Sequence, residues 1–326
     1  MSTDLSQMTG WSERISFRDL IVGGIILSEI LLGTLGNFNL LYHYLLCYHT
    51  EGRLRPTEFI LMHLTVSNSL LILSNGLPQT MAAFGLKHFL SNLGCDLVLY
   101  IQRVGKGVSI GTTCLLNVFQ AIMISPLDSC WKDLKVKAPK YVTLSICLYW
   151  ILCMFVNLIF PLHKFNIFHD WSMENITQKQ DLGYCYTTNV EKLSSAVYSA
   201  LIVFPEIFIS VLLIWTSGSM ILFLYRHKQR VQHIHSNHVF LISSVEFRAM
   251  QRILVLVSAF LYFHTFSSIL HMCVTLLSEE NGWLFNAAGI ISLCFPTVSP
   301  FLVRRHPSTL SRQTLFLIMN RYPQID

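Results

Sequence analysis

Charged residues are scarce in this chain of 326 residues. Lys and Arg number 23 and Asp and Glu 18, together 13% of the sequence, whereas a soluble protein of this length would carry about 80 of them. With 52% hydrophobic residues and a mean hydropathy of +0.50, this deficit excludes a disordered chain and a nucleic-acid-binding protein with broad basic patches. It also disfavours a water-soluble enzyme. The composition instead predicts a protein that lies in a lipid bilayer.

Several sequence signatures of other protein classes are also missing. There is no P-loop or Rossmann glycine pattern, and no His, Asp and Glu constellation of the kind that a membrane-embedded hydrolase needs. Duplicated halves and paired broken helices, which are typical of transporters, are not found either. We therefore expect a single domain over residues 1–326, without enzymatic activity, cofactor or metal site. A membrane transporter or channel is the alternative function.

Seven apolar runs are long enough to cross the roughly 30 Å hydrocarbon core of a bilayer as helices. They cover residues 20–46, 59–84, 93–124, 142–162, 196–225, 253–277 and 283–303. Polar residues interrupt the second run and basic residues the third, so we expect both helices to face protein or water rather than lipid. These residues are Ser67, Asn68, Ser69, Ser74 and Asn75, then Arg103 and Lys106. The sequence predicts an all-α membrane protein, a bundle of seven transmembrane helices.

The distribution of basic residues predicts how this bundle is oriented. Fifteen Lys and Arg lie in the segments after the first, third and fifth spans and beyond the seventh, and six lie on the opposite side. The positive-inside rule places the richer side in the cytosol. The polar first residues contain no signal peptide, so the first span is expected to act as its own insertion signal. We expect a multi-pass plasma-membrane protein with residues 1–19 outside the cell and a tail, residues 304–326, inside.

Two features on the expected outer side agree with this orientation. Asn175 begins an Asn-Ile-Thr sequon for N-glycosylation. Of nine cysteines, only Cys95, at the outer end of span three, and Cys185, in the loop that holds the sequon, are expected on this side. Because oxidising conditions there allow disulfides, we expect these two cysteines to pair.

Several landmarks resemble those of rhodopsin-like G-protein-coupled receptors. They are Gly36-Asn37, the stretch LTVSN at 64–68, Trp150, Pro205 and Pro300, together with the expected disulfide. Other positions depart from that class: FQA at 119–121 replaces Asp-Arg-Tyr, span six lacks its proline, and SPFLV at 299–303 replaces Asn-Pro-x-x-Tyr. An ordinary amine or peptide receptor is therefore disfavoured. With Gln120 in place of the usual arginine, the ionic latch of most such receptors cannot form in the usual way.

Longer stretches resemble the vomeronasal type-1 receptors, the pheromone-receptor family. They are RLRPT at 53–57, GLPQTMAAFG at 76–85, RVG at 103–105 with VS at 108–109, TCLL at 113–116, LGYC at 182–185, YRHKQRVQH at 225–233 and CFPTVSPF at 294–301. This resemblance implies detection of pheromones or other chemosignals by sensory neurons. It also implies coupling to an inhibitory-type heterotrimeric G protein, and small organic ligands that include steroids and their sulfates.

Ionisable residues at membrane depth are costly and usually mark a function or a buried pair. Span three carries Arg103 and Lys106, while Glu29 on span one and Glu206 on span five supply two acids. Two interpretations stay open. The four residues form internal salt bridges that lock the helices, or the basic residues bind a ligand.

The resemblance places the outer third of span three against the ligand cavity. Gln102 and Lys106 share one helix face, with Lys106 about 16 Å below Cys95, so these donors suit a sulfate or carboxylate. On span six, His264 and His271 lie on one side of the helix. The candidate ligand-binding residues are Gln102, Arg103, Lys106, Glu206, His264 and His271. The apolar walls are expected from Phe260, Phe263, Phe266, Trp283 and Phe285.

The expected partners are a small organic chemosignal, a heterotrimeric G protein and membrane lipid. The basic segment 226–238 is expected to contact anionic lipid and the G protein. Pro205 and Pro300 permit helix kinks, about which a signalling bundle can pivot. No nucleic-acid partner is expected.

Overall fold

The computed structural model describes residues 17–124, 132–170, 179–181, 183–188, 204, 207–223, 225–226, 237–276 and 282–304. Its long helices are α2 (Phe17–Glu51), α3 (Pro56–Leu71), α5 (Asn92–Ile124), α6 (Lys132–Asp170), α8 (Asn237–Leu276) and α9 (Gly282–Arg304). A π-helical turn, η2 (Ile72–Gly76), and α4 (Leu77–Ala83) continue α3 to complete the second span.

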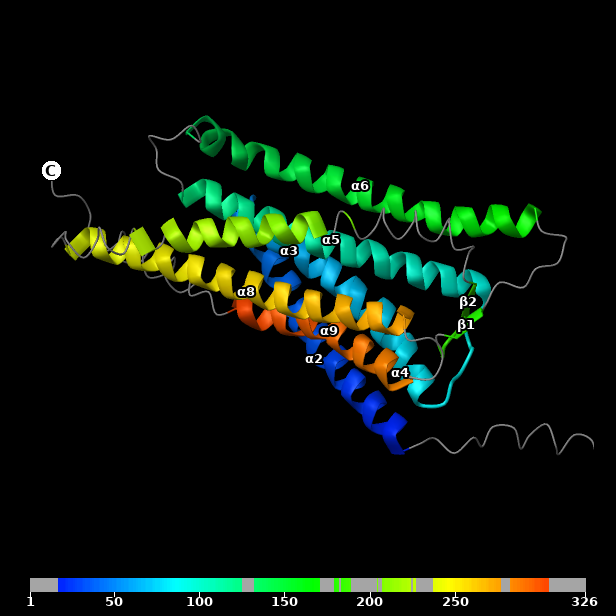
Figure 1. Ribbon diagram of the computed structural model, residues 1–326. Coiled ribbons are helices and arrows are strands. Elements are labelled where there is room, and N and C mark those ends of the chain that lie inside the picture. The colour runs from blue at the N-terminus through cyan, green and yellow to red at the C-terminus, as the bar shows by residue number, and fades with distance from the viewer. Residues whose placement is uncertain are drawn as a thin grey trace, which may run out of the picture.

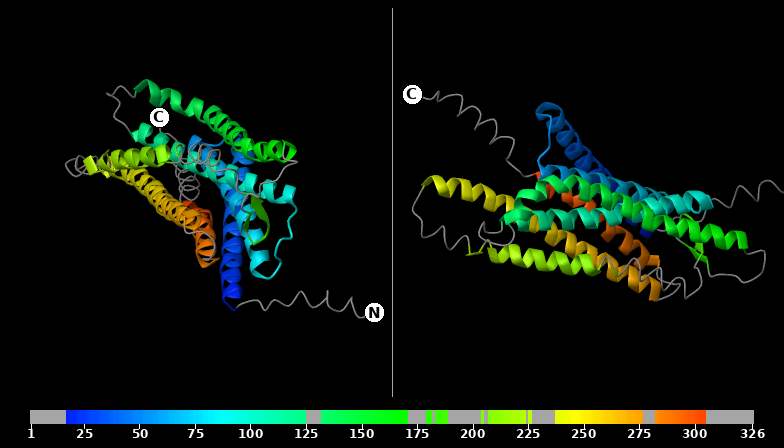
Figure 2. Two further views of the ribbon diagram at one scale, coloured as in Figure 1. Left: turned by 45° about the vertical axis from the view of Figure 1, so that its right-hand side comes forward. Right: turned by 90° about the horizontal axis from the view of Figure 1, so that it is seen from above.

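These helices form the predicted membrane bundle (Figure 1). In the described ranges, six spans are long and apolar enough to cross a membrane, and a shorter apolar helix, Ile207–Phe223, takes the place of the fifth predicted span. The all-α, seven-helix membrane fold predicted from the sequence is confirmed. Figure 2 shows that α2 crosses the other helices obliquely.

Local chemistry explains where the first span ends and where the second begins. Gly52 has a φ of +68°, a left-handed conformation that glycine adopts readily, and its N–H donates to Tyr48 O, which terminates α2. Pro56 opens α3, where a missing N–H costs nothing. The backbone N–H of Arg55 donates to the carboxylate of Glu58 at 3.0 Å, which closes the first turn.

Two helices extend well beyond the predicted apolar runs. α6 covers Lys132–Asp170, whereas the predicted span covered 142–162, and α8 begins at Asn237 instead of near residue 253. Hydropathy changes where the membrane ends, but backbone hydrogen bonding continues into water, so the apolar run underestimates the helix.

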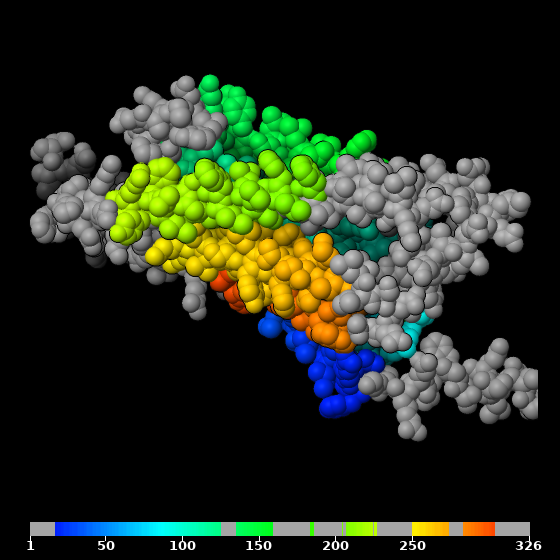
Figure 3. All heavy atoms as spheres, in the orientation of Figure 1, coloured from blue at the N-terminus to red at the C-terminus, as the bar shows by residue number. Residues whose placement is uncertain are grey.

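α5 lies at the centre of the bundle, against α3, α6 and α8, while α2 packs on α3, α4 and α9. The largest core cluster combines buried side chains of α3, α5, α6, Ile207–Phe223, α8 and α9. On the face shown in Figure 3, Ile207–Phe223 and α8 lie side by side. The predicted burial of the polar residues of span two is confirmed for Ser67, Asn68, Ser74 and Asn75.

One buried polar cluster joins α3, α5 and α9. The Nδ2 of Asn68 donates to Ser299 Oγ at 2.8 Å, and the Ser109 hydroxyl donates to Asn68 Oδ1 at 3.0 Å. We call Asn68 and Ser299 the deep pair. Landmark residues that the sequence placed in separate spans thus bond one another across the bundle.

Proline chemistry ties α2 to the same region. Pro300 has no N–H, so the carbonyl of Pro296, four residues earlier in α9, is left without its helical partner. Asn37 Nδ2 donates to this oxygen at 3.0 Å, and the Ser299 hydroxyl reaches it at 3.4 Å. Gly36 allows the approach, because a Cβ there would lie 3.1 Å from Pro300 Cβ. The expected helix-breaking proline is therefore used as a joint between α2 and α9.

A short hairpin lies at one end of the bundle, which we call the disulfide end. Strands β1 (Lys179–Asp181) and β2 (Tyr186–Thr188) pair antiparallel, with Lys179 opposite Thr188. Gly183, between them, has a φ of +80°, a conformation that favours glycine. The backbone of the α4–α5 loop bonds this turn, with His88 N–H donating to Gly183 O at 3.1 Å. No pattern in the sequence predicted this hairpin.

Candidate ligand-binding cavity

A cavity of about 70 Å³ lies between α3, η2, α5, α8 and α9, enough space for several water molecules by the roughly 15 Å³ that one water centre needs. Its described lining residues are Leu71, Asn75, Gln102, Lys106, Ser109, Ile110, Phe260, Phe263, His264, Ser267, His271, Ile291, Ser292, Phe295 and Pro296. Four separate spans contribute to it, so the site exists only in the assembled bundle.

The structure brings together four of the six predicted ligand-binding residues. Gln102 and Lys106 line the cavity from α5, and His264 and His271 line it from α8. The shared helix faces inferred from spacing are therefore present, and the two faces meet across one space. Arg103 is half-buried on α5 but is not among the described residues that line the cavity.

Two predicted site residues cannot be placed in this way. Glu206 and the sequon residue Asn175 lie outside the described residues. Glu29 is described, and its contacts are with α9: Cys294 Sγ donates to Glu29 Oε1 at 3.3 Å, and Thr297 Oγ1 donates to Glu29 O at 3.3 Å. Within the described residues the other carboxylate oxygen, Oε2, has no hydrogen-bond partner. The structure therefore does not bring Glu29 to the basic residues of α5, because span one packs beside spans two and seven.

The cavity is polar toward the disulfide end and aromatic at its floor. α5 runs away from that end and α8 runs toward it (Figure 1), so Gln102 and His271 lie nearest the disulfide and Phe260 farthest. Phe260 packs edge-on against Phe295 with ring centroids 4.9 Å apart, and stacks on His264 at 5.3 Å. The arrangement suits a ligand with a polar head and an apolar body.

Part of the predicted aromatic wall is wrong. Phe266 is 41% exposed and stacks on Tyr262, and Trp283 is 52% exposed. Phe285 is partly buried, but it is not among the described lining residues. The helical period orders residues around a helix, but it does not fix which side faces the bundle, so it cannot separate exposed rings from rings that line the cavity.

Sequence reasoning missed the small polar residues of the cavity. In the sequence, Asn75 stands out only as a polar interruption of span two, and no pattern points to Ser267 or Ser292. The Asn75 side chain bonds Ser292 across the bundle, with Nδ2 donating to Oγ at 2.7 Å. Intramembrane polarity in span two was the available signal, but its partner on α9 is separated by 217 residues.

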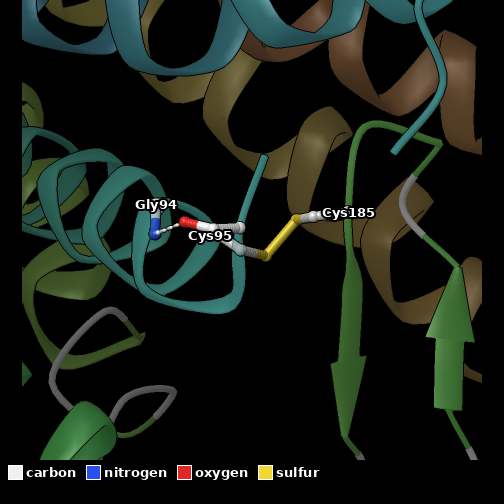
Figure 4. Close-up of a disulfide and its surroundings, with 4 residues drawn as sticks. Gly94, Cys95 and Cys185 are labelled. Carbon is white, nitrogen blue, oxygen red and sulfur yellow. Dashed lines mark hydrogen bonds between the residues drawn. A yellow bond between two sulfur atoms is a disulfide. The ribbon is translucent and has the colours of Figure 1, made fainter. Parts of the chain in front are cut away.

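The predicted disulfide is present above this cavity. Cys95 and Cys185 are bonded, with their Cα atoms 6.0 Å apart (Figure 4). Next to it, the Gly94 N–H donates to Ser91 Oγ at 3.2 Å, which caps the start of α5. Burial raises the pKa of the neighbouring Tyr184 to about 12, so its phenol stays protonated at physiological pH. The Cys95–Cys185 disulfide fixes the hairpin to the first turn of α5.

Comparison with known proteins identifies the family. The model of the vomeronasal organ pheromone receptor family matches residues 20–313. Vomeronasal type-1 receptor 4 of Homo sapiens is 48% identical over 280 residues, covering 86% of this chain and 92% of that protein. Vomeronasal type-1 receptor 3 of Pan troglodytes is 46% identical over 286 residues, covering 87% and 91%. Olfactory receptor class A-like protein 1 of Danio rerio is 27% identical over 287 residues, covering 87% and 88%.

These matches extend from the first span past the last, and the spans make the chain a multi-pass membrane protein of receptor type. They confirm the family that the local stretches resembled. The chain belongs to the vomeronasal type-1 receptor family, the chemosensory G-protein-coupled receptors with seven transmembrane helices.

Proposed function

We propose that this receptor binds a small organic anion, such as a sulfated steroid, in the outer half of the bundle, with its charged group at the cavity, and activates an inhibitory-type G protein. The observation that carries the proposal is the position of Lys106 and Gln102 on one cavity wall, opposite His264 and His271. A cation and an amide next to each other provide charge-assisted hydrogen bonds to a sulfate or carboxylate. The aromatic floor at Phe260 offers contact area to a steroid skeleton.

The membrane setting supports an anionic ligand. A lysine at this depth is unfavourable unless it is paired, and a bound anion would neutralise Lys106 where water is scarce. Arg103, three residues away on the same helix, adds positive potential without lining the cavity. Glu206, which lies outside the described residues, stays in the proposed site as a candidate acid for Lys106 in the empty receptor.

The proposed orientation puts the disulfide end outside the cell, with residues 1–19 there and residues 304–326 in the cytosol. The excess of basic residues on the other side supports it, as does the sequon at Asn175. A disulfide also needs an oxidising compartment. The cavity then opens toward arriving chemosignals, and the basic segment 226–238 meets lipid and the G protein. In this proposal, residues 1–326 form one domain.

A cell-based assay tests this function. The full chain is expressed with a reporter of inhibitory G-protein activation, and steroid sulfates are compared with the same steroids lacking the sulfate. We expect the sulfates to activate it, and pertussis toxin to abolish the signal. Lys106→Gln should raise the EC50 of the sulfates about 10-fold to 100-fold, the range for losing a hydrogen bond to a charged group.

Arg103→Gln is the matched control, because it removes a cation of the same helix and depth that does not line the cavity. We expect a change below about 3-fold for a charge without direct contact. An unchanged EC50 after Lys106→Gln contradicts the anion site. A ligand-dependent current in cells without functional G protein would support the channel alternative.

A further inference from the structure

We infer that Asn75 and Ser292 form a second, neutral subsite of the cavity, which hydrogen-bonds an uncharged oxygen of the ligand such as a ketone. The inference rests on the proposed function for the location of the ligand, and it adds a requirement that the anion site does not impose. Asn75 lies in η2 and Ser292 in α9, and both line the cavity.

The hydrogen-bond network fixes the orientation of the Asn75 amide. The Ser292 hydroxyl has one hydrogen, and it donates this hydrogen to Gly289 O at 2.7 Å. Ser292 Oγ can therefore only accept from Asn75, at 2.7 Å, so the atom facing it is Nδ2. On the other side, Gln79 Nε2 donates to Asn75 Oδ1 at 2.8 Å. The bond to Ser292 therefore sets the orientation of the Asn75 amide, and the Gln79 amide pairs with it in that orientation.

This network leaves one donor unused. An asparagine amide carries two hydrogens, and one of them goes to Ser292. The other has no hydrogen-bond partner among the described residues, although Asn75 is only 3% exposed. Because Asn75 lines the cavity, the remaining N–H is a donor held ready for a group that enters the cavity.

Packing holds this donor in place. A Cβ at Gly289 would collide with the Gln79 amide, so the helix contact leaves Gln79 little space to move. The Gln79 amide in turn contacts Asn75 directly, because its Nε2 donates to Asn75 Oδ1. Asn75 itself sits in a π-helical turn, a rare geometry that is frequent at functional sites. The donor is preorganised.

The chemistry of the two walls predicts what the ligand carries. The α5 wall has the cationic Lys106, and the η2–α9 wall offers a neutral N–H and the serine oxygen. A ligand that satisfies both has an anionic head and a separate uncharged oxygen. Loss of one neutral hydrogen bond is worth about 1 kcal/mol, or roughly 5-fold to 10-fold in affinity.

Four steroid probes separate this subsite from the anion site. They share one skeleton and differ by the presence of a sulfate and by a ketone or a methylene group in the rings. In the wild-type receptor, replacing the ketone should raise the EC50 about 10-fold, in line with one lost hydrogen bond. In Asn75→Leu, ketone and methylene probes should have equal EC50 values, while the sulfate preference persists. In Lys106→Gln, the sulfate preference should be lost while the ketone preference persists.

Three further variants keep the test decisive. Ser292→Ala leaves the amide of Asn75 without its anchor and should reduce ketone preference, whereas Ser258→Ala, exposed on α8, should not. If Asn75→Leu does not reach the surface, ketone preference is measured with Ser292→Ala and with Gly289→Ala, which displaces Gln79. Ketone preference that survives these changes, or is missing from the wild type, overturns the subsite. Loss of sulfate preference alone contradicts only the anion site.

Discussion

Asn68 with Ser299 and Asn75 with Ser292 follow one bonding pattern at two depths of the bundle. In each pair an asparagine Nδ2 donates to a serine Oγ on α9, and the serine hydroxyl turns to a carbonyl three residues earlier. Each asparagine oxygen accepts from a third side chain, Ser109 in one case and Gln79 in the other. The two asparagines are seven residues apart, and so are the two serines, which is about two helical turns.

Their surroundings differ. Asn75 and Ser292 are among the described residues that line the cavity, whereas Asn68 and Ser299 are not. Asn68 is 1% exposed and lies under the cavity floor, next to the α2–α9 contact at Pro296. The same amide chemistry therefore joins helices at the deep pair, and in our proposal it also binds a ligand group at Asn75 and Ser292, which we call the cavity pair. In that proposal, location rather than residue type separates structure from recognition.

Gly33→Leu should have the largest effect, because it acts on both pairs at once. A Cβ at Gly33 would lie 2.7 Å from Ile72 Cδ1 in η2 and 3.2 Å from Thr297 Cα in α9, and that backbone cannot move away. Overpacking of this kind costs about 3 kcal/mol at the upper end of its usual range. We expect loss of folded, monomeric receptor in detergent, measured by size-exclusion chromatography after heating. Gly24→Leu, where a Cβ meets nothing within 4 Å, is the control and should leave the receptor intact.

Asn68→Leu should have the next largest effect. It removes the bonds to Ser299 and Ser109 at once and leaves both hydroxyls buried. Side-chain hydrogen bonds between membrane helices contribute on average about 0.6 and at most about 1.7 kcal/mol each, so we expect a loss of about 2 kcal/mol and a clearly lower melting temperature. Asn39→Leu, on the exposed face of α2, should change neither the stability nor the melting temperature. An equal melting temperature for both variants would show that the deep pair holds no helices together.

Asn75→Leu should cost less, although its side-chain bonds match those of Asn68 in number. Water in the cavity can replace the lost bond to Ser292, and Gln79 already leaves one amide atom unpartnered within the described residues. We expect a loss of about 1 kcal/mol or less, between one and two helix–helix hydrogen bonds, in the same melting assay. A loss as large as that of Asn68→Leu would remove the distinction between a fastening and a recognising pair.

The sequence predicted the residue patterns that repeat along a single helix, but it did not predict the contacts that join two helices. Apolar runs identified every span, and the helical period placed Gln102 with Lys106 on one face. Placing Cys95 and Cys185 on the same side of the membrane was enough to pair them. These inferences use neighbours in sequence, or the sidedness of the membrane, which a single chain reveals.

The remaining features depend on contacts between distant segments. The Asn75–Ser292 bond spans 217 residues, and no local pattern links the two. The π-helical turn η2 has no sequence signature, and the rotation of α8 decided that Phe263 faces the cavity and Phe266 the outside. Four polar residues of span two are buried as expected, and Lys106 of span three lines the cavity, but the partners of the buried residues are set by packing.

Ser109→Ala should have the smallest effect on stability, and it tests how far the two regions are separate. Ser109 lines the cavity and also donates to Asn68 Oδ1, so its loss should cost about 0.6 kcal/mol, one average helix–helix hydrogen bond. In double variants, its effect should be non-additive with Asn68→Leu, by about the same 0.6 kcal/mol, since the two residues share one bond. With Asn75→Leu the effects should add, because Ser109 makes its side-chain bond to the deep pair and not to Asn75 or Ser292 within the described residues. Additivity with Asn68→Leu would contradict the bond. Non-additivity with Asn75→Leu would mean that the cavity and the deep pair respond as one unit. A receptor that transmits a signal through the floor of its cavity requires such coupling.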